Sequence, residues 1–143
     1  MVIDAIPQPE TDAAELQLHK TVLVVDDDRD QADVLSMRLE GQGYNTIIAN
    51  TGADALERAK QRVPNLIVLD LRLPDMSGFE VCQSLGDDVK TCQIPVIILS
   101  GMERPDIVRR ARSVGSSYYV RKPYDPNALL VLIENAVQEA TDW

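Results

Sequence analysis

Cysteine and histidine are scarce in this chain of 143 residues. The two cysteines, Cys82 and Cys92, form no CxxC motif, and His19, the one histidine, has no second ligand near it in the sequence. A zinc site needs several such residues at set spacings, and an acidic chain of this size needs no disulfide scaffold. We therefore expect two reduced thiols and a histidine without a chemical role.

Long apolar runs and positive charge are also missing. No apolar run approaches the ~20 residues of a membrane span, and the first residues lack the basic start and apolar core of a signal peptide. The net charge of −9 and the pI near 4.5 argue against binding to nucleic acid or to an anionic membrane. We expect a cytoplasmic protein that binds proteins or small ions, with no nucleic-acid or membrane partner.

Length and composition predict one domain. A chain of 143 residues with 45% hydrophobic content can bury one core but not two of ordinary size. Residues 1–19 mix prolines, acids and small residues without periodicity, which is typical of a flexible leader. We expect the folded domain to span residues 20–141.

Five short apolar runs alternate with helix-length amphipathic segments. Several runs are continuous in Val, Ile and Leu, which is typical of strands that are buried on both faces of a parallel sheet. The runs cover residues 21–26, 44–49, 65–70, 94–100 and 117–120. Three helix faces repeat apolar residues at i, i+3 and i+7: Ala32, Leu35 and Leu39; Leu56, Ala59 and Val63; Leu130, Ile133 and Val137.

Start signals for helices support these boundaries. Thr51 and Ser77 are each followed three residues later by an acid, and Asp125 precedes a proline at a first helical position. Strict strand–helix alternation with right-handed crossovers gives an α/β doubly wound sheet of five parallel strands. We expect the flavodoxin-like strand order 2-1-3-4-5, which follows from the fold class and not from the periodicity.

Carboxylates end two strands that would be neighbours in this sheet. The first strand ends in Asp26, Asp27 and Asp28, and the third ends in Asp70. Ligands of such sheets bind beyond the carboxyl ends of the strands at the switch point between these two. Two carboxylates ~4 Å apart repel by about 4 kcal/mol at an effective dielectric near 20, so a cation is expected. Mg²⁺ suits one or two carboxylates with phosphate oxygens, whereas Asp28 alone could simply cap the next helix.

The other strand ends bring a hydroxyl and an ammonium group. Ser100 ends the fourth strand and Lys122 follows the fifth. Hydrogen-bond donors and positive charge at the same rim are what a transferred phosphoryl group requires. Asp70 is then placed to be the nucleophile that forms an aspartyl phosphate. Gly78, in the loop that follows, allows a backbone conformation or a close approach that a side chain would block.

Four motifs together resemble the receiver domain of two-component response regulators, which is CheY-like. The motifs are VVDDD at 24–28, LDLRLPDMSG at 69–78, ILSG at 98–101 and YVRKP at 119–123. The resemblance covers about residues 20–140. It implies a phosphoacceptor protein of a phosphorelay that takes a phosphoryl group onto Asp70 from a histidine kinase or a histidine phosphotransfer protein, and that is no turnover enzyme.

The same resemblance implies roles for the other residues of the motifs. Asp26, Asp27, Asp70 and the backbone carbonyl of Arg72 would bind Mg²⁺. Ser100 and Lys122 would contact the phosphoryl group, and the peptide between Lys122 and Pro123 would be cis. Tyr119, three residues before the lysine, matches the switch aromatic that turns inward as the Ser100 loop moves.

The implied output surface consists of the fourth helix, the fifth strand and the fifth helix. It would bind a downstream protein target or a second copy of the chain. Arginines gather there and could dock an acidic partner, or could simply be solvated: Arg104, Arg109, Arg110, Arg112 and Arg121. Because little sequence follows the last helix, we expect a stand-alone regulator, with a receiver fragment of a longer regulator as the alternative.

Two other functions compete with this interpretation. A phosphohydrolase with an aspartyl nucleophile usually has a second acid two residues later, where this chain has Arg72. A phosphate-independent interaction module would not need Asp70, the neighbouring acids, Ser100 and Lys122 together. A flavin site is disfavoured because the acidic turn after the first strand would repel its phosphate.

Overall fold

The computed structural model describes residues 20–102 and 106–141. The predicted leader, His19 and Arg104 lie outside the described residues. Five parallel strands form one sheet in the order β2-β1-β3-β4-β5, so the predicted fold class and strand order are confirmed. The strands are β1 (Thr21–Val25), β2 (Asn45–Ala49), β3 (Leu66–Asp70), β4 (Val96–Ser100) and β5 (Tyr118–Arg121).

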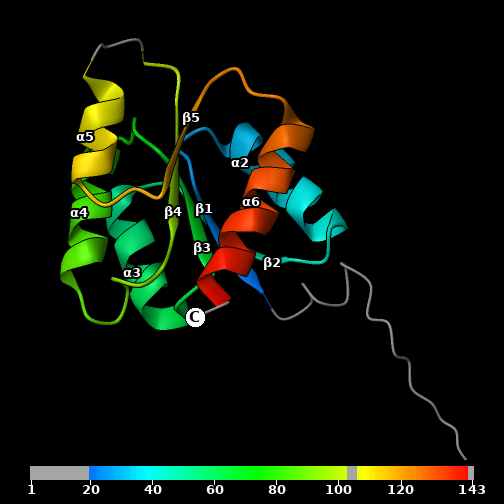
Figure 1. The fold of residues 1–143 in the computed structure, drawn as a ribbon, viewed down its shortest axis with the longest axis horizontal. Coiled ribbons are helices and arrows are strands. Elements are labelled where there is room, and N and C mark those ends of the chain that lie inside the picture. Colours follow the sequence, from blue (N-terminus) through cyan, green and yellow to red (C-terminus); the bar gives the residue numbers. More distant parts are fainter. Residues whose placement is uncertain (1–19, 103–105, 142–143) are drawn as a thin grey trace, which may run out of the picture.

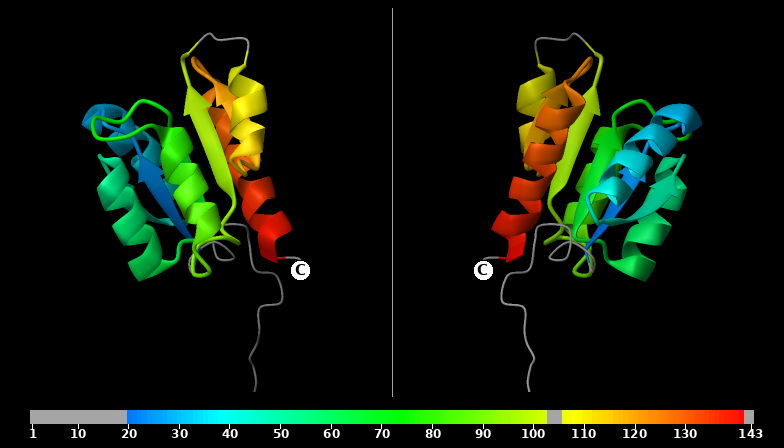
Figure 2. Two further views of the ribbon diagram at one scale, coloured as in Figure 1. Left: turned by 90° about the vertical axis from the view of Figure 1, so that its left-hand side faces the viewer. Right: turned by 90° about the vertical axis from the view of Figure 1, so that its right-hand side faces the viewer.

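Helices cover both faces of the sheet. They are α2 (Arg29–Gly41), α3 (Gly52–Arg62), α4 (Gly78–Asp87), α5 (Ile107–Ser113) and α6 (Pro126–Thr141). Helices α3, α4 and α5 lie on one face, and α2 and α6 lie on the other (Figure 1). The two views of Figure 2 show these faces in turn. Each face has its own hydrophobic core, one centred on Ile67 and Leu69, the other on Val68 and Ile97.

Strand β3 is the centre of the sheet. It pairs with β1 on one side and with β4 on the other, and its residues Leu66 to Leu69 are at most 1% exposed. Parallel pairing brings the carboxyl ends of these strands to one edge, with Val25 opposite Leu69 and Asp70 opposite Leu99. A rigid, fully buried strand therefore holds Asp70 at the edge where the acids of the β1 loop also lie.

The predicted helix starts are confirmed. The Thr51 side chain accepts a hydrogen bond from the Asp54 amide, and the Asp125 side chain accepts one from the Asn127 amide. Ser77 forms a capping box at the start of α4. Such caps satisfy amides that have no partner within the helix.

One predicted helix face was wrong at its last position. Val63 does not continue the buried stripe of α3 but follows the helix with φ 41° and is 50% exposed. Ala55 and Ala59 form the buried contact instead. The left-handed conformation at Val63 ends the helix, so its side chain leaves the apolar face.

The described residues contain no helix long and apolar enough to cross a membrane. Cys82 and Cys92 are free thiols, as predicted, the first buried and the second exposed.

Candidate functional site

The three carboxylates predicted to meet do meet at the carboxyl edge of the sheet. Asp26 and Asp27 follow β1 and Asp70 ends β3, and one oxygen from each lies within 4.8 Å of the others. We call Asp26, Asp27 and Asp70 the acidic cluster. Asp26 is buried, Asp70 is half-buried and Asp27 is exposed, so the cluster opens to solvent on one side.

Lys122 reaches the acidic cluster from the loop after β5. Its Nζ donates a hydrogen bond of 2.7 Å to Asp70 Oδ2 and lies 3.7 Å from Asp26 Oδ2. The Lys122 amide donates to the Ser100 carbonyl at 2.9 Å, which fixes the start of this loop against β4. The peptide between Lys122 and Pro123 is cis, as predicted. The ammonium group thus offsets part of the negative charge of the cluster.

Burial and charge shift the pKa values at this site. Burial raises the pKa of Asp26, the Asp28 amide and Lys122 partly oppose this, and Asp70 and Asp27 add to the rise through repulsion. Burial alone would lower the pKa of Lys122, but its hydrogen bond to Asp70 and the charges of Asp70 and Asp26 outweigh burial and raise it. Lys122 is therefore a stable cation, and it lies beside Asp26, whose ionised form is disfavoured.

The second oxygen of Asp70 is held by the loop that follows it. The Arg72 amide donates to Asp70 Oδ1 at 2.9 Å, and Arg72 forms an isolated bridge with Ser77. The Gly78 amide donates to the Leu71 carbonyl at 2.9 Å, which closes the loop onto the end of β3. Both Asp70 oxygens therefore have fixed directions.

Gly78 is required for a close approach. A Cβ atom at this position would lie 2.5 Å from the Asp70 carbonyl oxygen and 2.7 Å from the Leu71 Cα atom. The sequence left open whether Gly78 serves an unusual backbone conformation or a close approach. Gly78 does not have a positive φ, so the close approach is the reason for glycine.

Ser100 and Tyr119 lie on the neighbouring strands. Ser100 is 1% exposed at the end of β4, and its Oγ accepts a hydrogen bond of 3.0 Å from the Met102 amide. Tyr119 is half-buried opposite Ile98 and packs against the core beneath α3, α4 and α5. The structure thus places Ser100 next to Lys122 through the backbone, whereas Tyr119 is not brought to the acidic cluster.

Two further residues near the site had not been singled out. Gln31, in the first turn of α2, accepts a hydrogen bond from Lys122 Nζ at 3.1 Å. Asp75 accepts from the amides of Gly52 at 2.7 Å and Ala53 at 2.9 Å, which lowers its pKa and attaches the β3–α4 loop to the start of α3. Neither contact had a sequence signal, because Asp75 binds the start of a helix 23 residues earlier in the chain and Gln31 binds a lysine 91 residues later.

The donor set fits a hard divalent cation. Carboxylate oxygens are the ligands that Mg²⁺ prefers, and it commonly keeps several waters beside one or two protein carboxylates. The exposed side of the cluster leaves room for such waters. Asp28, the third acid after β1, is not part of the cluster. It is the cap of α2, which is the role that the sequence allowed for it alone.

Replacing Asp26 with Asn is expected to stabilise the metal-free protein by about 1 kcal/mol at neutral pH. The folded-state pKa of Asp26 is raised, so its ionised form opposes folding above that pKa, and a neutral amide removes this cost. Urea unfolding in a chelator measures the change. Asp33→Asn on the exposed face of α2 is the matched control and should have little effect. A less stable Asp26→Asn variant would contradict the argument.

The fold and the site define a class, a flavodoxin-like domain with carboxylates and a lysine at the switch point of the sheet. The family model of the response regulator receiver domain matches residues 22–134. The chain belongs to the response regulator receiver domain family. Members of this family are signalling proteins rather than turnover enzymes, and they typically bind Mg²⁺.

Relatives and solved structures agree with this. The chain is 32% identical over 126 residues to the DNA-binding response regulator MtrA of Mycolicibacterium smegmatis, covering 87% of this chain and 54% of that protein. It is 36% identical over 121 residues to the DNA-binding dual master transcriptional regulator RpaA of Synechocystis, and the match covers 85% of this chain and 50% of that protein. The crystal structure of a CheY-like receiver domain protein of Methanospirillum hungatei matches with a TM-score of 0.81 at 28% identity. The match covers 86% of this chain and 97% of that one. The chain spans about half the length of these curated relatives.

Proposed function

We propose that this chain receives a phosphoryl group on Asp70 from a histidine kinase or a histidine phosphotransfer protein. The observation that carries the proposal is the ammonium group of Lys122, hydrogen-bonded to Asp70 within a cluster of three carboxylates. The proposed receiver domain spans residues 20–141, which include all the described strands and helices.

The chemistry is an attack of a carboxylate oxygen on phosphorus. A bond forms between Asp70 and phosphorus while the bond between phosphorus and the donor's nitrogen breaks, and the electron pair leaves with the donor. Lys122 places positive charge against the phosphoryl oxygens, and the Ser100 hydroxyl donates to one of them. Asp26, Asp27, Asp70 and the Arg72 carbonyl would hold Mg²⁺, which supplies further positive charge when bound.

Fixed geometry around Asp70 supports this proposal. One oxygen accepts from the Arg72 amide and the other from Lys122, so the carboxylate is oriented before the donor arrives. Arg72 occupies the position where a phosphohydrolase of this kind would have its second acid, which favours phosphoryl acceptance over turnover.

The test is to incubate the protein with Mg²⁺ and acetyl phosphate and to measure its mass. A gain of one phosphoryl group that is lost slowly is the expected result. Continued turnover of small phosphate esters would support the hydrolase. No mass gain, with no spectral response to beryllofluoride, would support a phosphate-independent interaction module.

We propose that phosphorylation changes the surface formed by α5, β5 and α6, with Ser100 and Tyr119 as the switch residues. Tyr119 is half-buried on β5 and packs against the core that α5 also covers, so a change in its side-chain position would alter this surface. A protein target, or a second copy of this chain, would bind there. The expectation of no nucleic-acid partner stays a prediction, because the relatives named above are DNA-binding regulators. The expected cytoplasmic location also stays a prediction.

Charge reversal on this surface is expected to weaken binding of the downstream partner at least fivefold while phosphorylation is unchanged. Arg109 and Arg112 are the residues to replace with Glu, because Arg110 is engaged, with its guanidinium 4.6 Å from the centre of the Phe79 ring. Titration of the activated protein with the partner, or sedimentation for a second copy, measures the effect. Reversal of Arg62 on α3 and Lys90 in the loop after α4, both exposed, is the control. Equal loss in both variants would contradict a role for α5.

A further inference from the structure

The third acid of the DDD run organises the first turn of α2. Asp28 is the cap of this helix, and its Oδ1 accepts hydrogen bonds from the amides of Asp30 at 3.1 Å and Gln31 at 3.2 Å. These bonds satisfy two amides at the helix start and fix the backbone of Gln31. The run that supplies two carboxylates to the acidic cluster therefore also sets where the Gln31 side chain begins.

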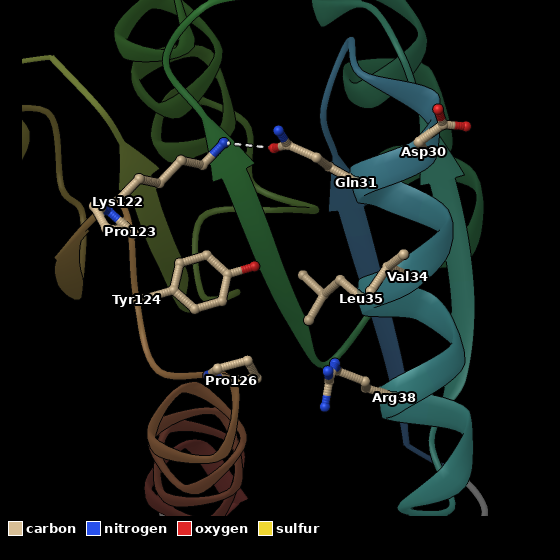
Figure 3. A pocket seen from close by; sticks show the side chains of 9 residues that line it. All are labelled: Asp30, Gln31, Val34, Leu35, Arg38, Lys122, Pro123, Tyr124 and Pro126. Carbon is tan, nitrogen blue, oxygen red and sulfur yellow. Dashed lines mark hydrogen bonds between the residues drawn. The ribbon is translucent and has the colours of Figure 1, made fainter.

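The side chain of Gln31 points toward Lys122 (Figure 3). Lys122 Nζ donates to Gln31 Oε1 at 3.1 Å and to Asp70 Oδ2 at 2.7 Å. Asp26 Oδ2, at 3.7 Å, attracts the ammonium group by charge but is too far for a hydrogen bond. The two hydrogen-bond acceptors come from different elements, the start of α2 and the end of β3.

Two acceptors constrain a side chain that is otherwise flexible. Lysine has a four-carbon stem and three rotatable donors, so one hydrogen bond leaves the ammonium group free to turn about it. A second acceptor on another element fixes both its position and its rotation. Gln31 is neutral and takes no part in phosphoryl transfer, so its acceptor is the same before and after Asp70 is phosphorylated.

We infer that Gln31 is a positioning residue that holds the Lys122 ammonium group in place for the phosphoryl group. The inference rests on the proposed function of Asp70. In this arrangement Asp28 fixes the backbone of Gln31, and the Gln31 side chain fixes the ammonium group of Lys122. That ammonium group then binds the oxygens of the incoming phosphoryl group. Loss of the Gln31 acceptor lowers the affinity for a phosphoryl group without removing any charge from the site.

The surroundings of Gln31 allow this to be tested without disturbing the core. Gln31 is exposed, and with Lys122 it lines one end of an open cavity of about 590 Å³ between α2 and the loop before α6. Leu35 and Tyr124 form its walls further along (Figure 3). A substitution at Gln31 therefore projects into open space and not into packed side chains.

The experiment compares Gln31→Met, which keeps the length but removes the acceptor, with wild type. Nitrogen-15 NMR of the Lys122 ammonium group, recorded without a phosphoryl analogue, should show slower hydrogen exchange in wild type. Titration with beryllofluoride and Mg²⁺ should show about fivefold to tenfold weaker binding for the variant, as expected for the loss of one hydrogen bond at an exposed side chain. The rescue variant, Asp30→Asn with Gln31→Glu, restores an acceptor at unchanged net charge and should recover the slow exchange.

The outcomes separate the two proposals. Failure of wild type to respond to beryllofluoride would count against the proposed function, while the ammonium signal would still test Gln31. Equal ammonium exchange in wild type and Gln31→Met, or beryllofluoride affinities within twofold of each other when wild type responds, would overturn the role of Gln31.

Discussion

Replacement of Asp70 with Asn is expected to abolish the mass gain after incubation with Mg²⁺ and acetyl phosphate. An amide oxygen has no negative charge and is a poor nucleophile toward phosphorus, so no stable phosphorylated product forms. The change is nearly isosteric, and the Asn oxygen can still accept from Lys122 or from the Arg72 amide, as Asp70 does. The loss should therefore be chemical, with circular dichroism and the unfolding midpoint showing a folded protein.

The control for Asp70→Asn is Asp75→Asn in the same loop. Asp75 is a carboxylate too, but it bonds the amides of Gly52 and Ala53 at the start of α3 and is not part of the acidic cluster. This variant should still gain one phosphoryl group. Labelling that persists in Asp70→Asn would place the acceptor elsewhere and would refute the proposed function.

Most of the fold could be predicted because its signals are local or follow from the alternation of strands and helices. Continuous apolar runs predicted the buried strands, and caps such as Ser77 marked the helix starts to the residue. Val63 shows the limit of such patterns. Its spacing fits the apolar face of α3, but the helix ends at Arg62. Apolar periodicity does not predict the left-handed backbone conformation at Val63, which turns its side chain away from that face.

The convergence of the acidic cluster could also be predicted, since parallel strands bring their carboxyl ends to one edge. What the sequence could not supply were contacts that depend on side-chain direction. The hydrogen bond between Gln31 and Lys122 joins residues that are 91 positions apart in the chain. No sequence motif predicts that these two residues pair. The contact of Arg110 with Phe79 is of the same kind, because a cluster of arginines gives no sign of which member lies over an aromatic ring.

Substitution of Gly78 with Ala is expected to lower the free energy of unfolding by about 1–3 kcal/mol, the typical cost of overpacking. The added methyl carbon would lie 2.5 Å from the Asp70 carbonyl oxygen and 2.7 Å from the Leu71 Cα atom. Both are backbone atoms at the end of the central strand, so neither can swing aside as a flexible side chain would. Urea unfolding measures the loss, and displacement of Asp70 should slow phosphoryl acceptance of the folded protein at least tenfold.

Gly86 in the same helix is the matched control for Gly78→Ala. A Cβ atom there meets nothing within 4 Å, so Gly86→Ala gains only the helix propensity of alanine, roughly 0.5–1 kcal/mol of stabilisation. The two variants make the same chemical change in α4, and the difference between them isolates the contact of Gly78 with the end of β3. Equal stability in both would show that the loop can move away from the strand. In that case the fixed direction of the Asp70 carboxylate would have to come from Lys122 and the Arg72 amide alone.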